Sequence, residues 1–122
     1  MDIKELIKVK NWVVIGDVSN ESKYAYKILN KFKEKGYTVS GVHPKGGEEI
    51  YKTLKEVPYN IDAIDLCINS KLGLEYMKEA NELGIRNVLI QPGAESEEIL
   101  LYCKENGINA IENCALVQLR SL

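Results

Sequence analysis

Charged segments that end in glycine alternate with short apolar runs along the chain. Three stretches, "KEKGYTV", "NELGIRNVLI" and "KENGINAI", pass from charged residues through a glycine directly into an apolar run. Glycine just after a helix adopts the left-handed conformation at little cost, so helices are predicted to end at Gly36, Gly84 and Gly107. Before each glycine, apolar residues recur at helical spacing and predict a buried stripe. These residues are Ala25, Ile28, Leu29 and Phe32, then Gly73, Met77, Ala80 and Leu83, and finally Ile99, Leu100 and Cys103.

The apolar runs between these helices have the length of β-strands. Several are apolar at consecutive positions, as expected where helices cover both faces of a parallel sheet. The alternation predicts a Rossmann-like α/β fold, a doubly wound parallel sheet of about five strands between two helical layers, with the order 3-2-1-4-5 or a close relative. Residues 2–9 are expected to form a short helix and 114–119 a closing helical turn. The expected strands are 13–16, 38–42, 63–69, 87–91 and 108–111, and a short extra strand would lie around 49–51.

Composition narrows the class of protein mainly by exclusion. The 122 residues are 45% hydrophobic and 28% charged, which is usual for a globular chain, and no linker interrupts them, so residues 1–122 are expected to form one domain. The net charge of −2 argues against a nucleic-acid surface. No apolar run is long enough for a membrane span, and the first residues lack a secretory core, so we expect a cytoplasmic protein. The three cysteines lack metal-ligand spacing and are expected to be free thiols, without a metal.

Four loops are expected at the carboxyl edge of the sheet, where open α/β sheets bind their ligands. They span residues 16–23, 42–47, 69–73 and 91–98, and three of them carry a lysine. The backbone at Gly16 and the start of the first long helix suit a phosphate. Pro44 is expected to stiffen the second loop. The loops together predict a cleft for a phosphate-bearing, adenine-type ligand.

The same loops resemble a known family. Gly16, Lys23 and Tyr26 follow the first apolar run, and "HPKG" follows the second. The chain then has Leu54, Pro58 and Asp62 before the third run, Gln91 and Gly93 after the fourth, and Cys114 near its end. In this order the residues resemble those of the small stand-alone CoA-binding domain proteins and, more distantly, the CoA-binding amino-terminal domain of the succinyl-CoA synthetase alpha subunit.

The resemblance implies a binding module for coenzyme A or an acyl-CoA, with the phosphates held at the Gly16 turn and the first long helix. Together with the four loops it indicates a set of cofactor-binding candidates. These are Gly16, Asp17, Val18, Ser19, Lys23, Tyr26, His43, Pro44, Lys45, Asn69, Ser70, Lys71, Gln91, Gly93 and Cys114.

The sequence departs from the family at the first loop and near its end. The family usually has Gly-Ala-Ser after the first strand, whereas this chain has Gly16-Asp17-Val18. A carboxylate at position 17 repels a phosphate unless it points away or bonds a ribose hydroxyl. Ser19 would supply a hydroxyl one position late. The family's Cys-Pro pair is replaced by Cys114-Ala115.

No trio of nucleophile, base and orienting group is visible, so no catalytic residue is assigned. Two alternatives stay open: a subunit or relative of an ADP-forming acyl-CoA synthetase, and an NAD-responsive domain. The second is disfavoured because no acidic residue ends the second strand. The expected partners are a small-molecule nucleotide, another copy of the chain or an acyl-CoA-handling subunit, and neither nucleic acid nor membrane.

Several other residues are interpreted as structural. Glu95, Glu97 and Glu98 suit the start of a helix, where they oppose the positive end of its dipole. Cys67 and Cys103 are expected on core faces. Asp62 and Asp65 are expected at the amino end of their strand, away from the ligand edge.

Overall fold

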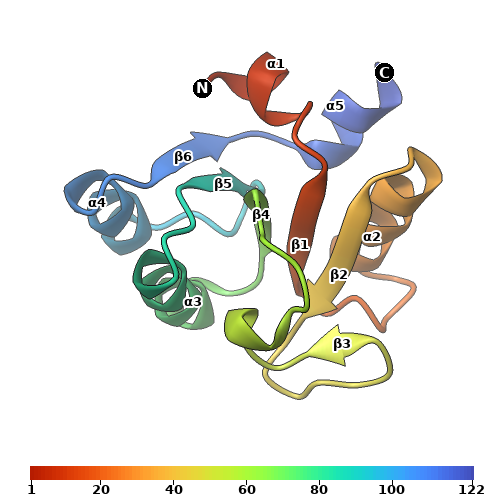
Figure 1. Ribbon diagram of the computed structural model, residues 1–122, viewed down its shortest axis with the longest axis horizontal. Helices are drawn as coiled ribbons and strands as arrows, with labels where there is room; N and C mark the ends of the chain where they lie inside the picture. Colours follow the sequence, from red (N-terminus) through yellow and green to blue (C-terminus); the bar gives the residue numbers. More distant parts are fainter.

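The computed structural model describes residues 1–122 and contains one parallel sheet of six strands (Figure 1). The strand order is β3-β2-β1-β4-β5-β6, and every neighbouring pair is parallel. This confirms the Rossmann-like α/β fold, with six strands rather than about five. The two-residue β3 lies at the edge of the sheet beside β2, and it confirms the short extra strand expected around 49–51. The strands are β1 (Asn11–Gly16), β2 (Thr38–Val42), β3 (Ile50–Tyr51), β4 (Ala63–Cys67), β5 (Asn87–Ile90) and β6 (Asn109–Glu112).

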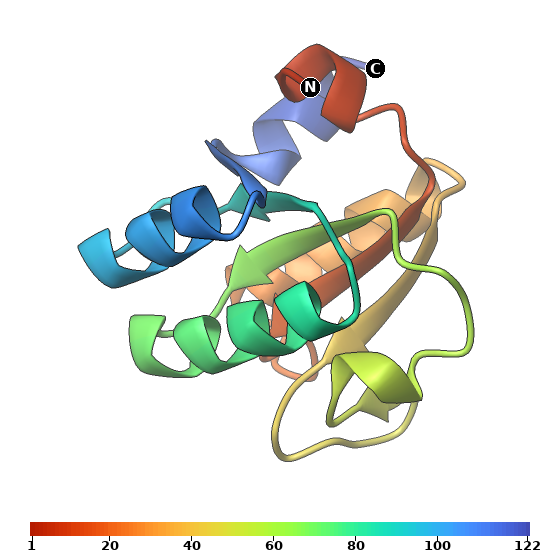
Figure 2. The same cartoon turned by 60° about the vertical axis from the view of Figure 1, so that its left-hand side comes forward.

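Helices cover both faces of the sheet, as the apolar strands predict (Figure 2). One face packs against α1 (Ile3–Leu6), α2 (Tyr24–Glu34) and α5 (Ala115–Arg120), and the other against α3 (Ser70–Glu82) and α4 (Glu97–Glu105). A single 3₁₀ turn, η1 (Leu54–Glu56), lies between β3 and β4. Alternate side chains of β1 point to opposite faces, so Trp12 and Val14 join the α2 side while Val13 and Ile15 join the α3 side.

The three glycines end their helices as predicted. Gly36, Gly84 and Gly107 have φ angles of 84°, 75° and 70°, in the left-handed region. The predicted position of Leu83 in a buried stripe is wrong, because α3 ends at Glu82 and the Leu83 side chain is 45% exposed.

Strand boundaries differ from the expected ones by one or two residues. The strand expected over 63–69 ends at Cys67, because Asn69 is the N-cap of α3 and its side chain accepts the Leu72 N–H at 3.0 Å. The first strand begins at Asn11, whose backbone N–H donates to the Asp62 carboxylate at 3.1 Å. Asp62 therefore has the structural role that the sequence indicates. The strands expected over 87–91 and 108–111 are observed at 87–90 and 109–112.

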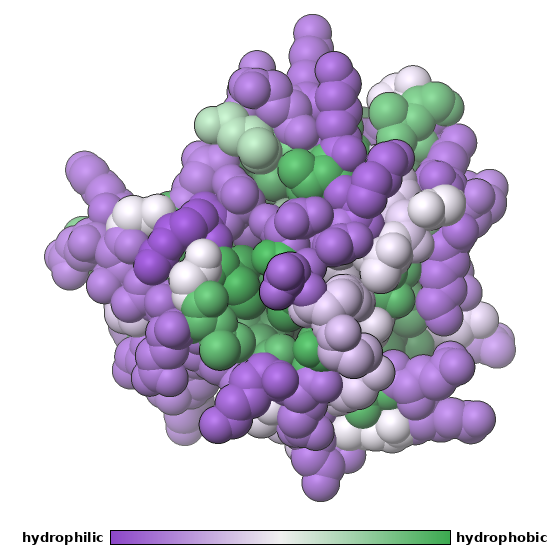
Figure 3. Space-filling model, in the orientation of Figure 1, coloured by the Kyte–Doolittle hydropathy of each residue, from purple (hydrophilic) through white to green (hydrophobic).

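Polar side chains cover most of the face seen in Figure 3, and apolar ones gather near its middle, between α3 and η1. A hollow of about 370 Å³ opens there, beside the end of α3, and its lining includes Leu54, Val57, Ile61, Leu83 and Ile85. None of the helices has the length and hydropathy needed to cross a membrane.

Candidate functional site

Three adjoining pockets follow the carboxyl ends of the strands, and we call them together the trough. The inner pocket, of about 380 Å³, lies between the start of α2 and the loops after β4 and β5. The connecting pocket, of about 90 Å³, shares Asp17 and His43 with the inner pocket. The outer pocket, of about 640 Å³, shares Val18 and Ser19 with the connecting pocket. A long ligand would therefore cross the carboxyl edge from β5 to β2.

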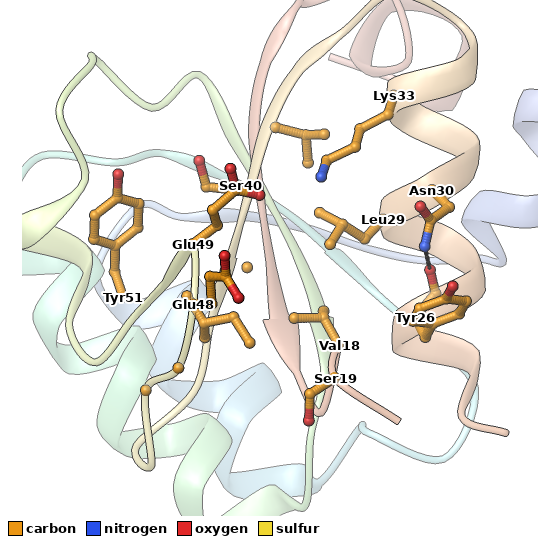
Figure 4. Close-up of a pocket in the computed structure, with 15 residues that line it drawn as sticks. Val18, Ser19, Tyr26, Leu29, Asn30, Lys33, Ser40, Glu48, Glu49 and Tyr51 are labelled. Atoms are coloured by element: carbon orange, nitrogen blue, oxygen red, sulfur yellow. Dashed lines mark hydrogen bonds between the residues drawn. The ribbon is translucent and has the colours of Figure 1, made fainter. Parts of the chain in front are cut away.

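The outer pocket lies between α2 and the exposed side of β2 (Figure 4). Leu29 and Lys33 contribute to its α2 wall, and Lys33 extends toward Ser40 of β2. Glu48 and Glu49 extend from the opposite loop into the same space. This pocket is thus wide, and it carries charges of both signs.

The amino end of α2 lacks the caps that other helices of this chain have. Its N-cap residue, Lys23, provides no side-chain hydrogen bond, and no acidic residue lies in its first turn. In α1, α3 and α4, by contrast, the side chains of Asp2, Asn69 and Ser96 cap the helix. Since Lys23 and the first residues of α2 line the inner pocket, the unpaired N–H groups and the positive end of the helix dipole lie beside it.

Gly16 sets how closely α2 approaches the sheet. A Cβ atom at this position would lie 2.4 Å from the backbone oxygen of Cys67 and 2.9 Å from the Ala25 Cβ. The missing side chain therefore lets the first turn of α2 pack directly onto the ends of β1 and β4. Gly41 serves the same purpose for Val18, whose Cγ2 atom would lie 2.4 Å from an added Cβ.

Asp17 places a carboxylate inside the trough. The Ser19 hydroxyl donates a hydrogen bond of 2.8 Å to Asp17 Oδ1, and chiefly for this reason the pKa of Asp17 is lowered. The charges of His43 and Lys23 lower it further. The Lys45 backbone N–H donates to His43 Nδ1 at 3.1 Å, which leaves Nε2 to carry the proton of the neutral ring. Asp17 is thus ionised, and the Lys23 ammonium can balance part of its charge.

Gln91 connects the inner pocket to the buried interior. Its side chain is 4% exposed, its Nε2 donates to Asp65 Oδ1, and its Oε1 accepts the Ala115 N–H at 3.3 Å. Asp65 is fully buried in the middle of β4, between Val14 and Leu89, and its Oδ2 has no hydrogen-bond partner. Burial raises the pKa of Asp65 to about 8, although the Gln91 hydrogen bond lowers it, so the carboxyl is protonated at neutral pH.

The expected place of Asp65 at the amino end of its strand is therefore wrong. Ala63 begins β4 and Asp65 is its third residue, on the face covered by α2 and α5. The signal was present in the run "AIDLC", where an acid interrupts residues that are otherwise apolar or small. A lone acid at such a position is rarely buried without a partner.

Two cysteines lie near the same group. Cys67, expected on a core face, also lines the inner pocket, and burial raises its pKa to about 12, so it is a thiol at neutral pH. Cys114 is the half-buried N-cap residue of α5 and lies near enough for its charge to raise the pKa of Cys67. Cys103 is buried in the core on the α3 side, as expected.

Ten of the fifteen candidate residues line the trough. The inner pocket contains Asp17, Lys23, His43, Asn69, Gln91 and Gly93; the connecting pocket adds Val18, Ser19 and Lys45; the outer pocket adds Tyr26. The other five do not line it: Gly16 lies beneath it, Pro44, Ser70 and Lys71 are exposed, and Cys114 begins α5.

Sequence reasoning missed other residues that line the trough. In the inner pocket these are Tyr24, Ala25, Cys67, Ile68, Pro92 and Ala94, and in the outer pocket they include Lys33, Glu48 and Glu49. Pro92 and Ala94 already lie within the expected loop 91–98, and extending the expected loops by one residue would have included Tyr24, Ile68 and Glu48. No group of three metal-ligating side chains is present in the structure.

The chain is similar to known proteins over almost its whole length. A family model described as a CoA binding domain matches residues 10–120. A conserved hypothetical protein from Pyrococcus furiosus is 32% identical, with a TM-score of 0.84 over 90% of this chain and 99% of that one. A hypothetical protein from Pyrococcus horikoshii is 24% identical, with a TM-score of 0.86 over 97% of this chain and 86% of that one. A protein from Thermus thermophilus is 20% identical, with a TM-score of 0.84 over 99% of this chain and 98% of that one. The last two likenesses show the fold alone.

Proposed function

The chain belongs to the CoA binding domain family, and from this premise we propose that it holds coenzyme A or an acyl-CoA in the trough without catalysing a reaction of its own. Membership of the family supports CoA binding in general terms. The position of the phosphates, the direction of the ligand and the absence of chemistry are our proposal.

The uncapped start of α2 is the single observation that carries the proposal. Its free N–H groups and helix dipole meet the inner pocket beside the Lys23 side chain, so a phosphate there would receive backbone hydrogen bonds and a positive charge. Gly16 supports this arrangement because it holds α2 close to the sheet. Lys45, in the connecting pocket, adds a second positive charge along the same path.

The two larger pockets would take the two ends of the ligand. The outer pocket, of about 640 Å³, has room for a nucleoside, and its Glu48 and Glu49 can accept hydrogen bonds from amino and hydroxyl groups. The inner pocket combines the amides of Asn69 and Gln91 with apolar neighbours, which suits an uncharged arm that carries amides and ends in a thiol or thioester.

Asp17 would restrict where the phosphates lie. A carboxylate repels a phosphate directly beside it, so we place the phosphates on the Lys23 side. Asp17 would then accept a hydrogen bond from a ribose hydroxyl, and the neighbouring Lys23 charge would reduce the electrostatic cost.

A binding role without chemistry agrees with the state of the groups in the trough. Cys67 is a protonated thiol and therefore a poor nucleophile at neutral pH. No carboxylate orients the His43 ring, because the hydrogen-bond partner of Nδ1 is the backbone N–H of Lys45. A role as a synthetase subunit would need further groups from a partner chain, and it stays a prediction of the sequence, as do cytoplasmic location and self-association.

Calorimetric titration with CoA, acetyl-CoA, NAD and ATP tests the proposal. We expect CoA and acetyl-CoA to bind more tightly than NAD and ATP, with dissociation constants below about 1 mM. No heat of binding with either CoA compound, from protein shown to be folded by its circular dichroism, would refute it.

A further inference from the structure

A continuous hydrogen-bonded chain runs from the centre of the sheet to the pocket. The Asp65 carboxyl, fully buried on β4, accepts the Gln91 amide, and Gln91 in turn accepts the first N–H of α5 from Ala115. Gln91 itself lines the inner pocket. The buried acid thus lies one residue behind the surface that a ligand would touch.

The Gln91 amide still has unused hydrogen-bonding capacity. A glutamine side chain offers two N–H donors and an oxygen with two lone pairs. Asp65 takes one N–H, and Ala115 uses one lone pair. One N–H and one lone pair remain on a side chain whose two ends are both held in place. A primary amide fixed in this way can bind another amide, which needs one donor and one acceptor.

We propose that Asp65 is a positioning residue of the trough, which fixes the Gln91 side chain so that its remaining N–H and lone pair bind an amide of the CoA arm. This inference rests on the function proposed above. Without the Asp65 carboxyl, the Gln91 N–H that now points into the core would lack an acceptor, and the amide would rotate or turn toward water.

Most of the side chains around Asp65 cannot ionise, so the ionisation of Asp65 itself is the main pH-dependent change in this part of the core. Val14 and Leu89 flank it on β1 and β5, and Ala25 and Ile28 of α2 belong to the same apolar cluster. The neighbouring titratable groups are the thiols of Cys67, on the same strand, and Cys114, before α5. No lysine, arginine or histidine contributes to the pKa of Asp65.

The test compares Asp65→Asn with Asp65→Leu in calorimetric titrations with CoA. Asparagine keeps an acceptor for Gln91, so we expect a dissociation constant within about threefold of the wild-type value. Leucine removes the acceptor, and we expect binding to weaken about tenfold. Gln91→Leu should weaken it similarly, and the double variant Asp65→Leu/Gln91→Leu should be no weaker than Gln91→Leu alone. Wild-type affinity for the Asp65→Leu protein, shown to be folded by its near-ultraviolet circular dichroism, would overturn the inference.

A measurement on the ligand-free protein separates this inference from the proposed function. The side-chain amide signals of Gln91 in a nitrogen–proton NMR spectrum should shift with pH around a midpoint near the Asp65 pKa of about 8, and this shift should be absent in Asp65→Asn. If these chemical shifts do not change between pH 6 and 10 in the wild-type protein, the proposal that Asp65 positions Gln91 is refuted. If the signals shift but CoA does not bind, the proposed function fails while Gln91 remains positioned.

Discussion

Asp65 makes a quantitative prediction about stability and pH, which Asp65→Asn isolates. Burial raises the pKa of this carboxyl from 3.8 to about 8 in the folded chain, so between these values the folded state binds a proton that the unfolded state releases. The stability contribution of the protonated Asp65 is therefore complete below about pH 4. It is lost as the pH rises, until the folded carboxyl also ionises.

The size of the effect follows from the pKa shift. One pKa unit corresponds to about 1.4 kcal/mol, so the free energy of unfolding should fall by about 1.4 kcal/mol per pH unit between pH 5 and 7 because of this group alone. The loss over that interval is about 3 kcal/mol, which is a large part of the 5–15 kcal/mol that stabilises a typical domain. Asparagine cannot ionise, so the variant should lack this component.

Urea denaturation at several pH values measures the difference. Trp12 is the only tryptophan and is fully buried against Phe32, with ring centroids 4.8 Å apart, so its fluorescence should report unfolding. Subtracting the variant's unfolding free energy from that of the wild type at each pH removes the other titrating groups. This difference in unfolding free energy, wild type minus variant, should decrease as the pH rises from 5 to 7. Two parallel curves would show that Asp65 is ionised at neutral pH and would refute the argument.

Three further predictions concern the trough. Lys23→Ala and Lys45→Ala should each weaken CoA binding more at low than at high salt in calorimetric titrations. Lys71→Ala, outside the trough, should change the affinity for CoA little at either salt concentration. Equal losses of affinity at both salt concentrations for Lys23→Ala and Lys45→Ala would contradict this. Gly16→Ala would bring a methyl group within 2.4 Å of a backbone oxygen and should lower stability by about 1–3 kcal/mol in thermal unfolding; an unchanged melting temperature would contradict this. Asp17→Asn removes a negative charge beside the phosphate path but keeps an oxygen that can accept the ribose hydroxyl, so it should tighten CoA binding several-fold at low salt, and weaker binding would contradict this.

The fold was predictable because its signals are local. Gly36, Gly84 and Gly107 end helices through their own backbone freedom, and the apolar runs of β1 and β4 have the composition of strands that are buried on both faces. The two-residue β3 is different, since it counts as a strand only because it pairs with Gly41 and Val42 of β2. The expected short strand around 49–51 is nevertheless confirmed, at Ile50–Tyr51.

The sequence predicts which loops form the candidate site. It predicts less well which side chains of those loops line it. Whether a loop residue faces the trough depends on the helix that follows it: Asn69 caps α3 and lines the pocket, but Ser70 and Lys71 have already turned onto the exposed first turn. The role of Asp65 depends on Gln91, which lies in the loop directly after β5. That contact is a property of the assembled sheet and is absent from either segment alone.

The position of β1 in the middle of the sheet has a consequence for the order of folding. It is the first strand along the chain, yet one of its two edges pairs with β4, where Val14 lies opposite Asp65. A nascent polypeptide that stops short of β4 would present an apolar strand with an open edge, which is the kind of surface that chaperones bind and that aggregates form on. The native core should therefore become compact on the ribosome only after translation has passed β4, and a chain stalled earlier should remain sensitive to protease.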